Sequence, residues 1–170
     1  MRKDSRGGRV LLKVAGSKSF LRFGAPVVPA LDRFVHRITG GRYLLSQGGV
    51  VPVMLLTTTG AKSGARRDVP LAYVPDGDVF YVVGSNYGRE THPAWTANLL
   101  RHPVASASVH GEQIDVRAHL LDDAEKHAVW PKLVDRWPNY DVYTERSGRD
   151  LRVFRLDRID GTTGRARHER

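Results

Sequence analysis

The sequence contains no cysteine, and this absence excludes several kinds of chemistry. Without a thiol, the chain cannot form a disulfide, use a thiolate nucleophile, or build a zinc or iron–sulfur site from cysteine ligands. A chain without cysteine also fits a reducing compartment, so we expect a cytoplasmic protein.

Long hydrophobic runs are missing as well. The longest nearly apolar run, Val50 to Leu56, has seven residues and contains Pro52, whereas a membrane-spanning helix needs about 20 residues. The basic start of the chain is not followed by the apolar region of a secretory signal. We therefore expect neither a membrane span nor export.

Three functional patterns are also lacking. None of the seven histidines forms a helical pair with a third ligand nearby, so no metal site is expected. There is no Gly-x-Ser-x-Gly motif, which makes a serine hydrolase improbable. The basic residues do not gather on one recognition helix, so sequence-specific DNA binding has little support.

Positive charge is abundant. Lys and Arg total 27 against 18 Asp and Glu, which gives a formal net charge of +9. This excess predicts an anionic partner: a nucleic acid, an acidic membrane surface, or a small ligand with phosphate or carboxylate groups. Composition alone does not choose among the three.

The length of 170 residues predicts one domain. We place it at residues 17–160, between a basic segment at 1–16 and a basic tail at 161–170, and we expect both ends to be poorly ordered.

Hairpins dominate the predicted secondary structure. Strands are expected at 53–58, 68–74, 79–84, 104–109, 113–120 and 151–156, and helices at 29–39, 93–101 and 122–136. Turn residues at 75–78 and at His110-Gly111 join two pairs of these strands. Adjacent hairpins argue against a parallel Rossmann sheet and predict a mainly β, α+β fold, a small antiparallel barrel with inserted helices.

The loop from Thr57 to Arg67 is the first candidate for function. Gly60 and Gly64 allow the backbone to turn its N–H groups toward an anion, and basic side chains follow at 62, 66 and 67. The alternative is an exposed hairpin loop whose charge only keeps it soluble.

A second candidate begins where the strand at 79–84 ends in Gly84-Ser85 and a helix follows shortly afterwards. Trp95 and Asn98 are three residues apart, so they are neighbours on one face of that helix. An aromatic plate beside an amide suits a flat heterocycle. Alternatively, Trp95 and Leu99 are ordinary core residues and Asn98 is a local cap.

A third candidate is the stretch 137–143, in which Trp137, Tyr140 and Tyr143 recur every three residues. On a helical turn this spacing stacks the rings along one side, where they would wall an apolar pocket. Ordinary core packing is the competing interpretation.

Several of these motifs, taken together and in order, resemble a known family. They are Thr-Thr-Gly-x-Lys-Ser-Gly-x-x-Arg at 58–67, Val-Pro-Leu at 69–71, Gly-Ser-Asn with a further glycine at 84–88, and His-Pro-x-Trp-x-x-Asn-Leu at 92–99. Residues 20 to 158 resemble the deazaflavin-dependent nitroreductase family, the coenzyme F420H2-dependent oxidoreductases with a split β-barrel fold.

The resemblance implies F420 as cofactor, which carries a phosphate and an oligoglutamate tail and is strongly anionic. It implies that the loop holds the phosphate and tail, and that later residues contact the cofactor and border its ring. The implied binding residues are Lys62, Ser63, Gly64, Arg66, Arg67, Pro70, Leu71, Ser85, Asn86, Tyr87, Gly88, Trp95, Asn98 and Leu99.

The resemblance also implies the reaction, a hydride transfer from reduced F420 to a quinone-like acceptor, with nitroaromatic compounds as occasional substitutes. The acceptor would lie against Trp137, Tyr140 and Tyr143. Ser85 or one of the two tyrosines would donate a proton or hydrogen bond.

The sequence departs from the better-known nitroreducing members at two positions. Trp137 stands where those members have Tyr, and Trp is larger and has no hydroxyl. Asn86 stands where some members have Lys, which removes one charge near the cofactor. We therefore expect quinone reduction rather than nitro reduction.

Other functions remain open at this stage. The same barrel could bind FMN, or it could carry F420 without catalysis; nucleic-acid binding through charge is a further alternative that we do not expect. Basic residues at 13, 18, 22, 33 and 37 alternate with apolar ones, so the N-terminal segment could rest on an anionic membrane, or pack on the barrel with a solvated basic face. The protein is expected to be a monomer or a homodimer.

Overall fold

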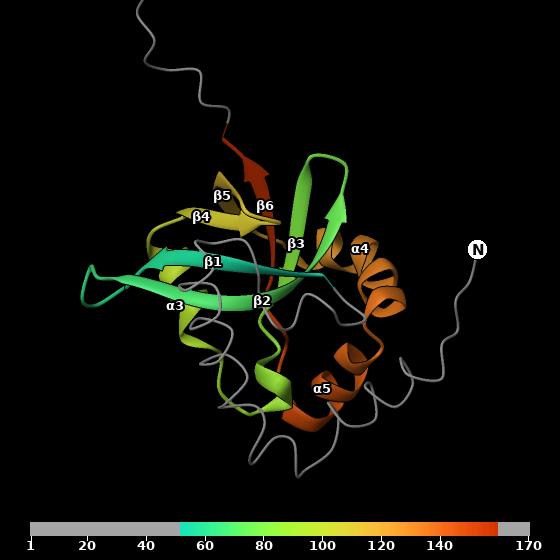
Figure 1. The fold of residues 1–170 in the computed structure, drawn as a ribbon. Helices are drawn as coiled ribbons and strands as arrows, with labels where there is room; N and C mark the ends of the chain where they lie inside the picture. The colour runs from blue at the N-terminus through green and yellow to red at the C-terminus, as the bar shows by residue number, and fades with distance from the viewer. Residues whose placement is uncertain (1–51, 160–170) are drawn as a thin grey trace, which may run out of the picture.

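Six antiparallel strands close into a barrel in the order β1-β2-β3-β6-β5-β4 (Figure 1). The computed structural model describes residues 52–159. The strands are β1 (Val53–Thr59), β2 (Arg66–Asp76), β3 (Val79–Val83), β4 (Val104–Val109), β5 (Glu112–Leu120) and β6 (Val153–Arg158). The predicted barrel and its α+β class are confirmed.

Both predicted hairpins are present. In the β2–β3 hairpin, Asp76 pairs with Val79 across a turn in which Gly77 has a φ of 57°. In the β4–β5 hairpin, His110 and Gly111 have φ values of 51° and 88°. Positive φ at the turn matches the right-handed twist of the flanking strands, which explains why these short turns set the register.

The interior of the barrel is filled by inward-facing side chains such as Met54, Leu56 and Val82, each fully buried. Along β5, Ile114 and Val116 are buried. Leu120 is 39% exposed. Leu120 is the last residue of β5, where the strand leaves the end of the barrel.

Two of the predicted helices are confirmed, α3 (Ala94–Arg101) and α4 (Asp123–Arg136). Pro93 is the N-cap of α3 rather than its first helical residue. α4 begins with a complete capping box: the Asp122 side chain accepts from the Glu125 amide at 2.8 Å, and Glu125 accepts from the Asp122 amide at 3.0 Å.

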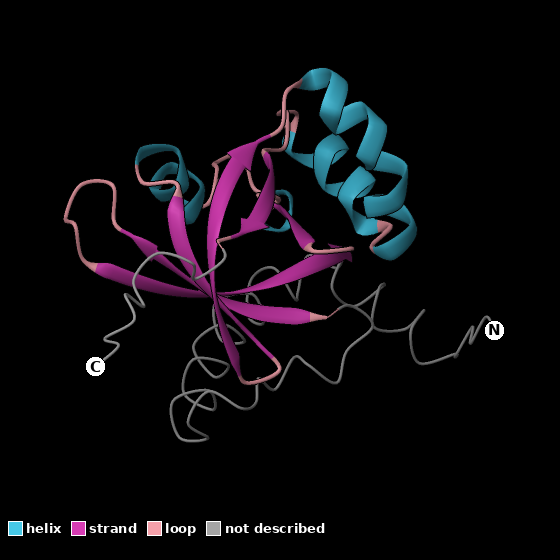
Figure 2. Ribbon diagram, turned by 90° about the horizontal axis from the view of Figure 1, so that it is seen from above, coloured by secondary structure: helices cyan, strands magenta, loops and turns pink. Residues whose placement is uncertain are grey.

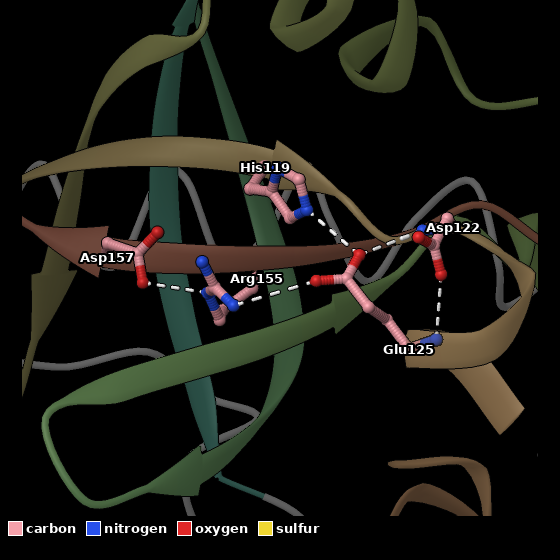
Figure 3. Close-up of polar contacts among 5 residues, drawn as sticks. All are labelled: His119, Asp122, Glu125, Arg155 and Asp157. Atoms are coloured by element: carbon pink, nitrogen blue, oxygen red, sulfur yellow. Dashed lines mark hydrogen bonds and ion pairs between the residues drawn. The ribbon is translucent and has the colours of Figure 1, made fainter. Parts of the chain in front are cut away.

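The start of α4 is also tied to the outer face of the barrel (Figure 3). The carboxylate of Glu125 lies 2.9 Å from His119 Nε2 on β5 and 3.9 Å from Arg155 Nη1 on β6. Arg155 in turn donates to Asp157 at 2.9 Å. These groups are exposed, so their pairing orients the helix and adds little stability.

A second core lies outside the barrel, where α4 and α5 (Asn139–Ser147) pack side by side (Figure 2). It contains Leu133, Tyr140, Tyr143 and Leu151, all buried, together with residues of β3 and β6. The helical turn predicted for the 137–143 stretch is therefore real from residue 139 onward, and Trp137 is the C-cap of α4.

The predicted helix at 29–39, the basic N-terminal segment and the tail at 161–170 lie outside the described residues, and the predicted domain boundaries stay predictions. Within 52–159, no helix is long and apolar enough to cross a membrane.

Candidate functional site

Two neighbouring cavities contain most of the residues that the sequence singled out. The larger, here called the basic cavity, has a volume of about 630 Å³ and lies between the β1–β2 loop and α3. The smaller, here called the aromatic cavity, has a volume of about 260 Å³. Both are lined by Val69, Asn86, Pro93 and Trp95. Because they share this wall, one elongated ligand could occupy both.

The β1–β2 loop keeps its shape through its own hydrogen bonds. The Gly60 amide donates to the Ala65 carbonyl, and the Gly64 amide to the Gly60 carbonyl, both at 2.8 Å. Gly64 has a φ of 66°, which favours glycine. A Cβ at residue 60 would lie 3.2 Å from the Ala65 carbonyl oxygen and 2.7 Å from the rotatable Ser63 Oγ, so close approach also favours glycine at this position.

Asn98 fastens this loop to α3. Its side-chain oxygen accepts from the Ala61 amide at 2.9 Å, and its side-chain nitrogen donates to Thr58 Oγ1 at 2.9 Å. Thr58 donates to the Arg67 carbonyl at 3.3 Å, which links β1 to β2. Asn98 and Thr58 are both buried. Asn98 is therefore more than a local cap: it positions the loop while lining the basic cavity.

These bonds limit the number of backbone N–H groups in the loop that can bind an anion. The amides of Gly60, Ala61 and Gly64 donate within the chain. Among the amides of residues 60–65, those of Lys62 and Ser63 alone engage no acceptor within residues 52–159. Both residues line the basic cavity, so a bound anion would meet these two N–H groups rather than the whole turn.

The cations of the basic cavity are Lys62 and Arg67, both exposed. Arg66, the first residue of β2, does not line it. Asp68 also lines the cavity, and its carboxylate accepts a hydrogen bond from Thr57 Oγ1 at 2.8 Å. The basic cavity therefore has two positive side chains and one carboxylate, and that carboxylate already accepts a hydrogen bond within the chain.

The aromatic cavity is walled by rings from two parts of the chain. Trp137, Tyr140 and Tyr143 come from the α4–α5 junction, and Tyr87 comes from the segment between β3 and α3. The Tyr87 and Tyr143 rings meet edge to face with centroids 6.4 Å apart. The floor includes Leu71 and neighbouring residues of β2.

The phenols of Tyr140 and Tyr143 remain protonated. Burial raises the pKa of Tyr140 well above its usual value, with a smaller contribution from Tyr143. Burial also raises the pKa of Tyr143, against the effect of hydrogen bonds from Trp137 and Asn139. Both hydroxyls are therefore suited to hydrogen-bond donation, and neither is suited to act as a base at neutral pH. Core packing and pocket lining turn out to be compatible, since both rings do both.

The segment between β3 and α3 has an uncommon backbone. Asn86, Tyr87 and Gly88, which form the short 3-10 helix η3 (Asn86–Gly88), have φ values of 47°, 56° and 74°. Left-handed conformations at two successive non-glycine residues are costly and often mark functional sites. A Cβ at Gly88 would lie 3.2 Å from Tyr143 Cα, so this glycine also allows η3 to approach α5.

Most of the predicted site residues come together in these cavities. Ser63, Pro70, Leu71, Ser85, Asn86 and Tyr87 line one or both of them, as do the tryptophans, tyrosines and basic residues described above. The Ser85 hydroxyl engages no group within residues 52–159, which leaves it able to contact a ligand.

Four predicted cofactor-binding residues line neither cavity: Gly64, Arg66, Gly88 and Leu99. Gly88 packs against Tyr143, and Leu99 is 2% exposed within the barrel core. Direct contact of these four with a ligand stays a prediction.

Sequence reasoning missed some lining residues, of which Thr58, Val69 and His92 are examples. Alternation along β2 could have found Val69, because it shares a strand face with Leu71. The pairing of Thr58 with Asn98 joins residues 40 apart in sequence, and no local pattern announces it.

A third cavity, of about 530 Å³, lies between α4 and α5 and has the opposite charge. Among the residues lining it are the acidic side chains Asp123, Asp141, Glu145 and Asp150, and the cation Lys126, which pairs with two of them. It contains none of the predicted site residues. An anionic ligand would be repelled there, so the basic and aromatic cavities form the candidate site.

Comparison with known proteins adds independent findings. A family model described as F420H2-dependent quinone reductase matches residues 30–157. An F420H2-dependent quinone reductase of Mycobacterium tuberculosis (strain ATCC 25618 / H37Rv) is 32% identical over 127 residues, covering 73% of this chain and 85% of the relative. The range matched by the family model includes the residues that line both cavities.

Solved structures give a consistent result. The structure of an F420-H2 dependent reductase, FDR-A, is 34% identical and covers 62% of this chain and 94% of that chain, with a TM-score of 0.58. A structure described as a domain-swapped dimer is 31% identical and covers 74% and 95%, with a TM-score of 0.61.

Proposed function

Because this chain belongs to the F420H2-dependent quinone reductase family, we propose that its two joined cavities bind reduced F420 and a quinone-like acceptor. The observation that carries the proposal is the shared wall. It places a charged cavity, suited to a polyanionic cofactor, in direct continuity with an aromatic one, suited to a flat ring and its acceptor.

The residues of the basic cavity fit the anionic part of the cofactor. The free amides of Lys62 and Ser63, with the side chains of Lys62 and Arg67, form a donor set for phosphate or carboxylate oxygens. The loop is held by a hydrogen bond from the Ala61 amide to Asn98, so little ordering entropy would be lost on binding.

When bound, reduced F420 supplies the hydride that leaves C5 of its ring. The chain's own residues orient and shield that transfer. Trp95, at the shared wall, would support a flat ring, and Tyr140 and Tyr143 would exclude water from the acceptor. The Ser85 hydroxyl and the protonated phenols of Tyr140 and Tyr143 are the groups we propose as hydrogen-bond or proton donors to the acceptor.

The alternatives are less favoured. FMN lacks the oligoglutamate tail, and both the family model and the M. tuberculosis relative are F420H2-dependent. A carrier without catalysis would not need the aromatic cavity beside the coenzyme site. Nucleic-acid binding does not explain a buried Trp95 that borders both cavities.

The neighbour described as a domain-swapped dimer favours a homodimer over a monomer for this chain. Analytical ultracentrifugation distinguishes the two. Location in the cytoplasm stays a prediction, as does contact of the N-terminal segment with an anionic membrane. Equal pelleting of the full chain and of a chain lacking residues 1–25 with anionic vesicles would contradict that contact.

The direct test mixes the purified protein with F420H2 and menadione and follows the return of oxidised-deazaflavin absorbance. We expect protein-dependent oxidation. Tight F420 binding without oxidation of several quinones would support the carrier, and absence of binding would overturn the site itself. A parallel assay with a nitroaromatic acceptor, on the protein and on Trp137→Tyr, tests whether the tryptophan disfavours nitro reduction.

A further inference from the structure

One arginine outside both cavity linings holds the segment 84–89, in which Asn86 and Tyr87 have left-handed backbone conformations. Arg149 donates from Nε to the Arg89 carbonyl at 3.0 Å, and from Nη2 to the carbonyls of Gly84 and Ser85 at 3.1 and 2.8 Å. Its Nη1 lies 2.9 Å from Nδ1 of His92. A single side chain thus binds the beginning of the segment at Gly84 and Ser85, its end at Arg89, and His92 shortly after it.

The end of α5 explains how Arg149 reaches that position. Gly148 is the C-cap of α5 and has a φ of 61°, the left-handed conformation that commonly ends a helix. The chain therefore reverses direction immediately before Arg149. The side chain is half-buried, and its three nitrogens reach four partners, whereas a lysine ammonium has only three N–H donors on a single nitrogen.

The segment needs such support because its backbone is unfavourable. Residues in left-handed conformations cost about 1–3 kcal/mol each and persist only where surrounding structure fixes them. Local bonds exist, such as that from Gly88 N to the Ser85 carbonyl at 2.9 Å and that from Asn86 Nδ2 to the Thr91 carbonyl at 2.9 Å. Arg149 adds hydrogen bonds from outside the segment, where the Tyr143 ring packs on Tyr87 and the Arg152 carbonyl accepts from the Gly84 amide at 2.8 Å.

His92 contributes an acceptor only when its Nδ1 carries no proton. Burial lowers the pKa of His92, and the nearby guanidinium groups of Arg152 and Arg149 lower it further, while the carboxylate of Asp150 acts in the opposite direction. His92 is therefore neutral at neutral pH and accepts from Arg149. Below its pKa, a second positive charge would replace that hydrogen bond.

We propose that Arg149 is a positioning residue that keeps Ser85, Asn86 and Tyr87 in the geometry required at the shared wall of the two cavities, and that this support weakens when His92 is protonated. The inference rests on the proposed function for its effect on catalysis. Its effect on the segment itself can be measured in the protein without cofactor.

The first test is amide hydrogen exchange at Gly88 and Arg89 in the full chain without cofactor. We expect Arg149→Ala to accelerate exchange at these two amides by about tenfold or more, relative to amides of the barrel strands. Arg155→Ala is the matched control, because Arg155 pairs with carboxylates on the outer face of the barrel. Unchanged exchange in Arg149→Ala would overturn the proposal.

The second test uses F420 binding and F420H2 oxidation. We expect Arg149→Ala to lower kcat with menadione by about 100-fold, more than it weakens F420 binding, because misplacement of the ring penalises the reaction step. Millimolar guanidinium should restore part of the rate, whereas an equal concentration of sodium chloride should not. A loss of activity that guanidinium does not restore at all would count against positioning.

The third test needs no arginine variant, which covers the case in which Arg149→Ala does not fold. In the wild-type chain, exchange at Gly88 and Arg89, corrected for its intrinsic pH dependence, should accelerate as the pH falls below the His92 pKa. His92→Gln keeps an acceptor that does not titrate, so this acceleration should disappear. If it persists in His92→Gln, the role of His92 is wrong.

These readouts separate the two proposals. If the wild-type protein does not oxidise F420H2 but Arg149→Ala still loosens residues 88 and 89, the proposed function fails and the structural role of Arg149 stands. If the wild-type protein is active and the variant is unchanged in exchange and rate, only the inference about Arg149 fails.

Discussion

The basic and aromatic cavities share a wall but are built in opposite ways. The basic cavity takes its charge from Lys62 and Arg67, exposed side chains beside a loop. The aromatic cavity takes its wall from Tyr140 and Tyr143, which are 3% and 1% exposed and belong to the second core. The charged groups that would bind a ligand are exposed, whereas the aromatic wall belongs to the hydrophobic core and contributes to stability.

This difference predicts which substitutions change ligand affinity alone and which change both ligand affinity and stability. Replacing an exposed cation should change ligand affinity and leave stability intact. Replacing a buried ring should reduce both. The basic cavity is mixed, however, because its loop depends on the buried pair of Thr58 and Asn98.

The largest effect is expected for Tyr143→Ala. Loss of a fully buried ring should lower the free energy of unfolding by about 3–5 kcal/mol, since a large cavity is left behind. Urea unfolding followed by circular dichroism measures it. Val142→Ala, at the 41% exposed neighbour on α5, is the control and should cost less than about 0.5 kcal/mol. A similar small cost for both would contradict the structural role of the aromatic wall.

Thr58→Val tests the buried support of the basic cavity. The substitution keeps the shape but leaves the Asn98 side-chain nitrogen without its acceptor, so we expect a loss of about 1–3 kcal/mol in unfolding free energy. Thr57→Val, on the neighbouring residue, removes only a partly exposed bond to Asp68 and should cost less. Equal costs would mean that the Thr58–Asn98 pair does not hold the loop.

Lys62→Glu separates affinity from stability most cleanly. We expect F420 binding to weaken more than tenfold, or about 1.4 kcal/mol, with an unchanged urea midpoint. Isothermal titration measures the affinity. Lys132→Glu makes the same change in net charge away from both cavities, so its affinity should match that of the wild type. Equal weakening in both variants would assign the effect to overall charge.

The smallest effect is expected at Glu125, on the outer face of the barrel. The hydrogen bond that Glu125 accepts from His119, and then the one from the Asp122 amide, lower the pKa of Glu125 from its ordinary value. A lowered pKa stabilises the fold above the unfolded value, and this contribution disappears as the pH falls through the folded value. The stability difference between wild type and Glu125→Gln should therefore shrink toward zero in acid. A difference that grows in acid would contradict the assignment.

Local patterns were sufficient to predict most of the described fold. The β2–β3 and β4–β5 hairpins have glycine at their turns, and α4 begins at a complete capping box, so neighbouring residues contain the relevant signals. The exposure of Leu120 could not be predicted in this way, because alternation indicates a face of the strand but does not indicate where the barrel interior ends.

The candidate site was predictable only in part. The motifs located both cavity walls, because ring spacing and loop charge are local features. The links that hold those walls are not local: Thr58 to Asn98 spans 40 residues, and Arg149 to Gly84 spans 65. Such pairs depend on how the barrel closes, and one sequence carries no signal for them.

The position of Trp95 has a practical consequence for following ligands in solution. Its side chain lines both the basic and the aromatic cavity. The other two tryptophans are Trp130 and Trp137. A chain with phenylalanine at 130 and 137 would emit fluorescence from Trp95 alone. One optical signal would then report the arrival of either ligand, and stopped-flow mixing would reveal which of them enters first.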